Sequence, residues 1–145
     1  MKKKQPKYKS KFEEKIAGIL GDLVTYEPDR INFLQPEKER YYLPDFKIAD
    51  KVYIEAKGIW AFEDRQKHLW IKEQHPDIKI FFLFQNSNIK ITKKSKTTYG
   101  DWATKNGFTW ADYREGIPKE WLSYGNPANS RKPRRASRNK SNTIP

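Results

Sequence analysis

The stretch VYIEAK, residues 52–57, decides how we expect this chain to fold, because its side chains alternate as a β-strand requires. One face of such a strand is apolar and carries Val52, Ile54 and Ala56. The opposite face carries Glu55 and Lys57 as neighbours. We therefore predict a strand that presents an acid and a base side by side.

A second β-rich run, YYLPDFKI over residues 41–48, lies immediately upstream and contains Asp45. The short connection at residues 49–51 would fold this run back antiparallel against residues 52–57. Such a hairpin can bring Asp45 to Glu55 and Lys57. We therefore predict that two carboxylates and one ammonium group share a site.

This combination of side chains suits the hydrolysis of phosphodiesters. Two carboxylates bind a hard cation through oxygen, and the cation polarises a phosphoryl group and lowers the pKa of a bound water. The ammonium group of Lys57 can orient that water or offset charge on the phosphoryl oxygens. We expect Mg²⁺, with Mn²⁺ as a substitute, at one or two ions per site. The alternative is that the Glu-x-Lys pair is ordinary solvated surface on an exposed strand.

The Pro-Asp…Glu-x-Lys pattern resembles the signature of the restriction-endonuclease-like nuclease superfamily. Within it, the chain resembles endonuclease I of T-seven-like phages, a family that resolves four-way (Holliday) DNA junctions. The resemblance extends from about Ser10 to Leu122 and leaves out both tails. Six segments follow the pattern of that family in order: Ser10–Ile16, Tyr42–Phe46, Ile54–Trp60, Glu63–Leu69, Glu73–Pro76 and Thr98–Gly100.

The resemblance implies an α/β fold with a restriction-endonuclease-like core, in which helices flank a mixed β-sheet. It also implies a homodimer whose subunits exchange their N-terminal segments and whose paired cuts resolve branched DNA. The catalytic residues of the family correspond to Glu13, Asp45, Glu55 and Lys57, and the backbone carbonyl of Ala56 is a further metal ligand. Ala56 replaces the threonine typical of that position, which a carbonyl ligand tolerates.

Glu13 has a competing structural interpretation. Ser10-Lys11-Phe12-Glu13 is a capping box, in which Ser10 caps a helix and the Glu13 side chain reaches back to the Ser10 amide. Helical spacing nevertheless places Glu13 at the border of the apolar stripe, whereas Glu14 lies on the opposite side. With the resemblance added, we expect Glu13 to bind metal or position water, and Glu14 to be helix surface.

The formal net charge of +12 resides in the two ends of the chain. Residues 1–11 and 131–140 are rich in Lys and Arg and contain no acid. Basic arms of this kind suit a polyanion and resist ordering by themselves. We therefore expect a basic, disordered arm at residues 1–11, a nuclease domain at residues 12–122 and a basic, disordered tail at residues 123–145.

Other basic residues are candidates for DNA contact. The alternatives are helix surface for those in the middle of the chain and a solvated loop for the last four. The candidates are Lys2, Lys3, Lys4, Lys7, Lys9, Lys11, Arg65, Lys67, His68, Lys72, Lys90, Lys93, Lys94 and Lys96.

Turn and capping signals divide the middle of the chain into helices and strands. We expect helices at Lys11–Leu20, Phe62–Gln74 and Tyr99–Lys105. We expect further strands near Leu23–Glu27, near Ile31–Leu34 and at Ile78–Phe84. The alternation of strands and helices favours a mixed α/β sheet in one domain.

Composition excludes several classes of protein. The chain has no cysteine, and its two histidines lack the spacing of a zinc site. No apolar run follows the first lysines, so we expect a cytoplasmic protein, in an infected bacterium if a phage encodes it, with no membrane partner and no small-molecule cofactor. The main prediction is a Mg²⁺-dependent DNA endonuclease for branched junctions. The alternatives are a sequence- or mismatch-specific nuclease of the same superfamily and a non-enzymatic DNA-binding protein.

Overall fold

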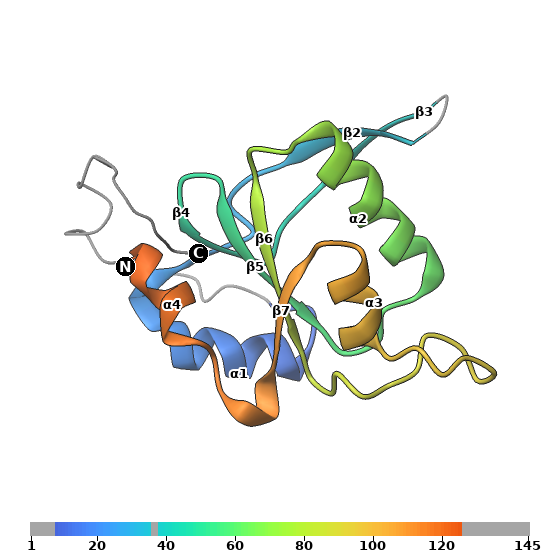
Figure 1. Cartoon of the computed structure of the whole chain (residues 1–145). Coiled ribbons are helices and arrows are strands. Elements are labelled where there is room, and N and C mark those ends of the chain that lie inside the picture. Colours follow the sequence, from blue (N-terminus) through green and yellow to red (C-terminus); the bar gives the residue numbers. More distant parts are fainter. Residues whose placement is uncertain (1–7, 36–37, 126–145) are drawn as a thin grey trace, which may run out of the picture.

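A five-stranded sheet forms the centre of the protein in the computed structural model, which describes residues 8–35 and 38–125 (Figure 1). The predictions for residues 1–7 and 126–145 lie outside the described residues. The strands occur in the order β1 (Thr25–Tyr26), β4 (Phe46–Ala49), β5 (Val52–Lys57), β6 (Lys79–Phe84) and β7 (Thr109–Asp112).

The sheet is mixed, as the sequence predicts. β1 and β4, and β4 and β5, pair antiparallel, while β5, β6 and β7 run parallel. Parallel neighbours require crossover connections. Helix α2 (Phe62–Gln74) connects β5 to β6, and α3 (Tyr99–Lys105) lies between β6 and β7.

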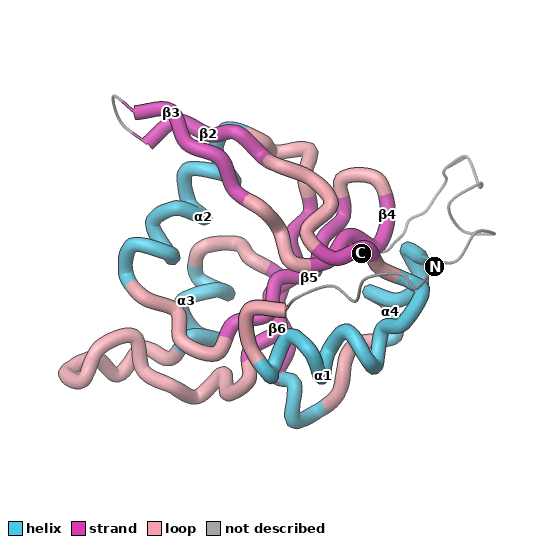
Figure 2. Tube along the Cα trace, turned by 180° about the vertical axis from the view of Figure 1, so that it is seen from behind, coloured by secondary structure: helices cyan, strands magenta, loops and turns pink. Residues whose placement is uncertain are grey.

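Helices cover both faces of the sheet (Figures 1 and 2). Helix α1 (Lys11–Leu20) and the short α4 (Lys119–Leu122) pack on one face, where Ile16, Ile54 and Leu83 are fully buried. Helices α2 and α3 cover the other face, around Trp60 and Phe82. The alternation of β5 is confirmed, because its odd- and even-numbered residues face different helices, but all six residues are buried.

The run at residues 41–48 does not form one strand. Strand β3 (Lys38–Tyr42) pairs with β2 (Ile31–Gln35) in a separate two-stranded sheet, and β4 begins only at Phe46. Pro44 explains the break, because proline lacks the N–H group that a continuous ladder needs. The β2–β3 hairpin projects from the body beside α2 (Figure 1).

The folded part extends beyond the expected nuclease domain of residues 12–122. Tyr8 and Tyr124 both pack against the core on the α1 face. The expected strand at Leu23–Glu27 is shorter, because a 3₁₀ helix at Gly21–Leu23 precedes β1. Strand β7, helix α4 and two further 3₁₀ helices (Tyr113–Glu115 and Ser123–Gly125) were not predicted. Within the described residues, no helix is both long enough and apolar enough to cross a membrane.

Two helical glycines have opposite surroundings, and this predicts opposite effects on stability. A Cβ atom at Gly100 would lie 2.7 Å from the indole ring of Trp110. Trp110 Nε1 donates a hydrogen bond to Thr104 Oγ1 at 2.7 Å, which holds the ring in place. A Cβ atom at Gly18 would meet nothing within 4 Å.

We expect Gly100→Ala to lower the free energy of unfolding by about 1–3 kcal/mol through overpacking. Gly18→Ala should raise it by about 1 kcal/mol, because alanine is the better helix former. Urea unfolding followed by circular dichroism measures both. Stabilisation by Gly100→Ala would show that Trp110 moves aside freely.

Candidate metal and catalytic site

All four side chains that the sequence and the resemblance single out line one open pocket of about 500 Å³. Glu13 comes from α1, Asp45 from the turn before β4, and Glu55 and Lys57 from β5. Each of the four is at least 90% buried. The alternative of a solvated Glu-x-Lys surface is therefore wrong.

Three hydrogen bonds fix Asp45 and Glu55 relative to the sheet. The Ala56 N–H donates to Asp45 Oδ2 at 2.9 Å, and the Asp45 N–H donates to Glu55 Oε1 at 3.1 Å. The hydroxyl group of Tyr42 donates to the same Glu55 oxygen at 2.5 Å. The predicted meeting of Asp45 with Glu55 and Lys57 is therefore confirmed, although Asp45 lies in a turn and not in a strand.

Lys57 is held between two carboxylates. Its Nζ atom lies 3.2 Å from Glu55 Oε2 and 2.5 Å from Asp64 Oδ2. Burial alone would lower the pKa of the Lys57 ammonium, but the negative charges of Glu55 and Asp64 raise it above its ordinary value. Lys57 is therefore a fixed positive charge in this pocket, which we call the acidic pocket after Glu13, Asp45 and Glu55.

Asp64 is a site residue that the sequence analysis missed. It lies in the first turn of α2, and its Oδ1 atom is 3.1 Å from Nζ of Lys67 and 3.7 Å from Nε2 of His68. Burial opposes its ionisation, but Lys57 and Lys67 lower its pKa to about 2. The available signal was its position seven residues after Lys57, because a helix that follows a strand can return its first turn to the end of that strand.

Glu13 faces the site and does not complete a capping box. Ser10 caps α1 as predicted, since its Oγ atom accepts from the Glu13 N–H at 3.1 Å. The Glu13 carboxylate, however, accepts from the Tyr26 hydroxyl at 2.6 Å and from the Lys9 N–H at 3.3 Å. Glu14 is exposed, as expected for helix surface.

Glu27 is a second residue that the sequence analysis missed. One oxygen from each of Glu13, Glu27 and Asp45 lies within 4.8 Å of the others. The Glu27 N–H donates to the Asp45 carbonyl at 2.8 Å, and the backbone of Glu27 has a φ of 45°. Positive φ is uncommon for a residue with a side chain, and such outliers concentrate at functional sites.

This donor set fits a hard cation. Carboxylate oxygens are the ligands that Mg²⁺, Mn²⁺ and Ca²⁺ prefer, and three converging carboxylates repel one another without a positive charge between them. Lys9 relieves part of that repulsion, because its Nζ atom lies 2.8 Å from Glu27 Oε2. Sequence spacing did not reveal Glu27, because only the pairing of β1 with β4 places it beside Asp45.

Two predicted DNA contacts are corrected by burial. Arg65 is 4% exposed and donates to the Trp60 carbonyl at 2.8 Å, while His68 is 1% exposed between the rings of Tyr42 and Phe82. Burial also lowers the pKa of His68 and keeps it neutral. Neither side chain can reach a phosphate in this structure, because both are buried in the packed interior.

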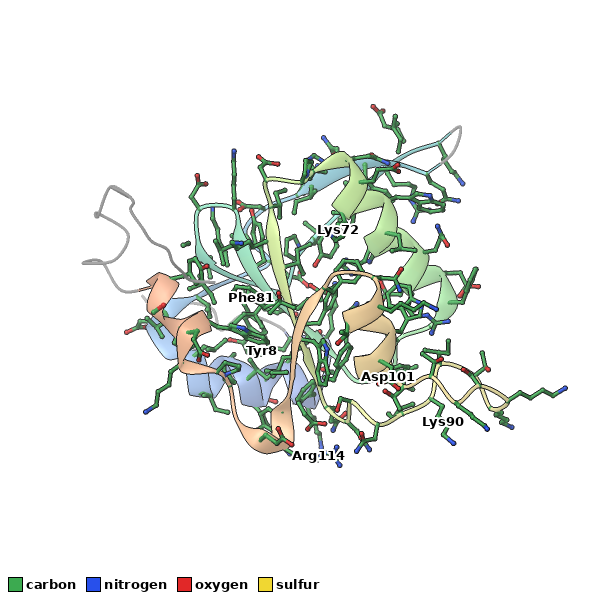
Figure 3. All side chains as sticks on the ribbon, in the orientation of Figure 1. Tyr8, Lys72, Phe81, Lys90, Asp101 and Arg114 are labelled. Atoms are coloured by element: carbon green, nitrogen blue, oxygen red, sulfur yellow. The ribbon has the colours of Figure 1, made fainter. Side chains whose placement is uncertain are left out.

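The remaining candidates for DNA contact lie in different places. Lys9 and Lys67 line the acidic pocket, and Lys11 is exposed on α1. Lys90, Lys93, Lys94 and Lys96 are exposed on the loop after β6, where Figure 3 shows Lys90. Lys2, Lys3, Lys4 and Lys7 lie outside the described residues.

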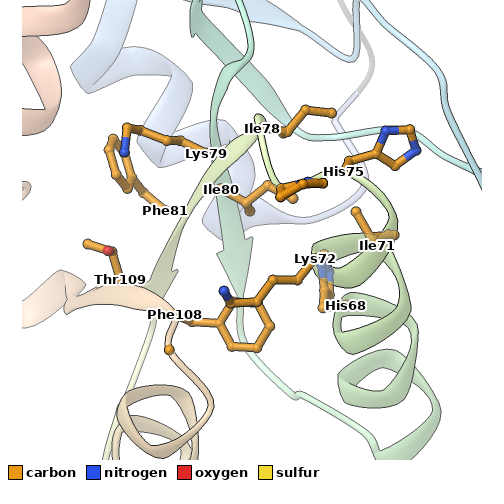
Figure 4. Close-up of a pocket in the computed structure, with 12 residues that line it drawn as sticks. His68, Ile71, Lys72, His75, Ile78, Lys79, Ile80, Phe81, Phe108 and Thr109 are labelled. Atoms are coloured by element: carbon orange, nitrogen blue, oxygen red, sulfur yellow. The ribbon is translucent and has the colours of Figure 1, made fainter.

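Lys72 lines a second pocket of about 220 Å³ at the other end of β6 (Figure 4). Lys79 adds positive charge there, and Phe108 adds an aromatic wall. The lining contains no carboxylate, so this pocket is not a site for a hard cation.

The acidic pocket predicts a dependence of stability on pH. Burial and the charges of Glu55 and Glu13 raise the pKa of Asp45 to about 9. The folded protein therefore binds this proton more tightly than the unfolded chain. The stabilisation is complete below the ordinary value of 3.8 and is lost as pH rises through about 9.

We expect the free energy of unfolding in EDTA to fall between pH 6 and pH 9.5 in the wild type, and to fall less in Asp45→Asn. Urea unfolding across this range measures the difference. Parallel profiles for the two proteins would contradict the raised pKa.

The sequence of this chain is similar to those of known proteins. The family model described as phage endonuclease I matches residues 1–140. Endodeoxyribonuclease 1 of Enterobacteria phage T3 is 41% identical over 108 residues, which cover 72% of this chain and 71% of the relative. Endonuclease I of Escherichia phage T7 is 36% identical over 118 residues, which cover 79% of this chain and 78% of the relative. The chain therefore belongs to the phage endonuclease I family.

Proposed function

We propose that this protein is a metal-dependent DNA endonuclease that resolves four-way and other branched DNA junctions by paired phosphodiester hydrolysis. The observation that carries the proposal is the convergence of Glu13, Asp45, Glu55 and Lys57 in one pocket. The names of the two relatives, an endodeoxyribonuclease and an endonuclease, support the reaction class.

The acidic residues would hold the metal ion. Glu13, Glu27 and Asp45 supply converging oxygens, and Glu55 with the Ala56 carbonyl would complete the ligands as the resemblance implies. When bound, Mg²⁺ supplies Lewis-acid polarisation of the phosphoryl group and a lowered pKa for water. We also propose that the core of the protein is of the restriction-endonuclease-like type.

Lys57 would stabilise the negative charge that develops on the phosphoryl oxygens. Glu55 and Asp64 hold its ammonium group in place before substrate binds, so little reorganisation is needed during the reaction. Asp64 acts as a positioning residue in this scheme, because it contacts Lys57 and is not among the converging carboxylates.

The positive charge of the protein supports a DNA substrate. The formal net charge is +12, and Lys9, Arg40 and Lys67 line the acidic pocket itself. The lysine-rich loop after β6 begins beside the catalytic strand, since the Gln85 N–H donates to the Lys57 carbonyl at 2.9 Å. Cations in these positions would bind the phosphates that flank the scissile bond.

Other functions account for less of the structure. A DNA-binding protein without enzymatic activity has no use for buried carboxylates, whose mutual repulsion costs stability. A sequence- or mismatch-specific nuclease would use the same site, and only its choice of substrate would differ. Substrate choice is therefore the decisive measurement.

We expect the wild type to make paired nicks near the branch point of a four-way junction in Mg²⁺, and none in EDTA. Lys57→Ala should abolish cutting, because it removes the positive charge that offsets developing negative charge. Asp45→Asn should abolish cutting while it preserves or tightens binding, because it removes a metal ligand and adds no negative charge beside the phosphate. Gel analysis of a labelled junction beside a linear duplex of the same arm sequence measures all of these.

Equal cutting of junction and linear duplex would keep the nuclease and refute the junction specificity. Binding without any cutting would favour the non-enzymatic alternative.

A homodimer would supply the two sites that paired cuts need. The structure brings Glu13 to Asp45 within one chain, and the exchange of N-terminal segments implied by the resemblance would make the same contact between chains. The two arrangements differ in how mutations combine. In an exchanged dimer, Glu13 of one chain completes the site of the other.

We expect co-refolded Glu13→Ala and Asp45→Ala chains to regain nicking, because an exchanged heterodimer concentrates both changes in one site and leaves the other intact. The matched control is Asp45→Ala with Glu55→Ala, which damages both sites in either arrangement. Failure of the first mixture to exceed the control would refute the exchange.

A further inference from the structure

Two large apolar side chains project into solvent on the segment that follows β5. Ile59 is 83% exposed and Phe62 is 64% exposed. Within residues 8–35 and 38–125, no other large apolar side chain is as exposed as either of them. Burial of exposed apolar surface contributes about 25 cal/mol per Å², so a partner that covers both side chains would gain free energy from them.

The segment that carries them is rigidly anchored. Trp60, between them in sequence, is 1% exposed and packs against the rings of Phe82 and Phe84 at centroid distances of 4.8 and 5.2 Å. The Trp60 N–H donates to the Tyr99 hydroxyl at 3.1 Å, and the Trp60 carbonyl accepts from Arg65 at 2.8 Å. Because Trp60 occupies the interior, its neighbours are directed outward.

Ile59 and Phe62 are both close in sequence to residues of the proposed site. Ile59 lies two residues beyond Lys57 and lines the same pocket as Glu13 and Asp45. Phe62 is the first residue of α2, and Asp64 of the same helical turn contacts Lys57. Ile59 therefore lies in the pocket itself, and Phe62 begins the helical turn whose Asp64 holds Lys57.

We propose that Ile59 and Phe62 form an apolar wedge that contacts unstacked bases at the branch point of the DNA substrate; this rests on the proposed function. The charge around the pair favours a nucleic acid, because Lys9, Arg40 and Lys67 line the same pocket. Isoleucine and phenylalanine are among the side chains that enter base steps, and every base offers a face for aromatic stacking.

The wedge explains selectivity for structure over sequence. In linear duplex the faces of the bases are covered by their neighbours, and unstacking one step costs a few kcal/mol. At a branch point the stack is already interrupted, so a base face is available at lower cost. Apolar contact of this kind reads no sequence, because it makes no hydrogen bond to a base edge.

The test compares Ile59→Ser, Phe62→Ser and the double variant with the wild type. Ile19→Ser is the matched control, because Ile19 is 57% exposed on α1 and does not line the pocket. Binding is measured in EDTA to a four-way junction and to a linear duplex, each with 2-aminopurine beside the branch point or at the equivalent position. Single-turnover cleavage in Mg²⁺ is measured on the same DNA.

The wild type should raise 2-aminopurine fluorescence in the junction, because the probe is unstacked. The double variant should lose this rise and bind the junction about tenfold more weakly, with linear duplex binding unchanged. Ile19→Ser should behave as the wild type. Thermal midpoints should be the same for all variants, because the substituted side chains are exposed.

Unchanged junction affinity and fluorescence in the double variant would overturn the wedge. The wedge is also overturned if light scattering gives the double variant a smaller particle mass than the wild type. Ile59 and Phe62 would then belong to an interface between chains. A wild type that cuts no DNA in Mg²⁺ refutes the proposed function itself, whereas a cutting double variant with full junction preference refutes only the wedge.

Discussion

The burial of charge at the carboxyl end of β5 is the constraint on which the rest of the structure depends. Glu55 and Lys57 are 5% and 7% exposed, so each needs a partner of opposite charge or a hydrogen bond. Glu55 and Asp64 surround the Lys57 ammonium, and Tyr42 and the Asp45 N–H satisfy Glu55. These contacts dictate where the β3–β4 turn and the first turn of α2 must lie.

A second set of acids remains incompletely neutralised. Glu13, Glu27 and Asp45 converge, and the raised pKa of Asp45 reflects burial together with the neighbouring negative charges. Stability alone would favour removing one of them. A site that binds a divalent cation needs this arrangement, because the ion supplies the missing positive charge. The repulsion among these acids and the proposed metal binding thus have the same electrostatic cause.

Local signals predicted the helices well and the tertiary environment of their side chains poorly. The bounds of α1, α2 and α3 were predicted correctly because capping residues, Gly21 and Pro76 act through neighbouring backbone. His68 was expected on the surface, although it packs between Tyr42 and Phe82 from distant elements. Glu27 and Asp64 escaped prediction for the same reason, since their partners are distant in sequence or on another element.

The sequence by itself determined the alternation of β5, the three main helices and the meeting of Asp45 with Glu55 and Lys57 across one hairpin. These features depend on residue spacing and short connections, which are local. Only the tertiary structure decided that both faces of β5 are buried, that Glu27 joins Glu13 and Asp45, and that Asp64 holds Lys57. These depend on strand order and helix packing, in which many weak contacts between distant segments act together and no single short motif records the result.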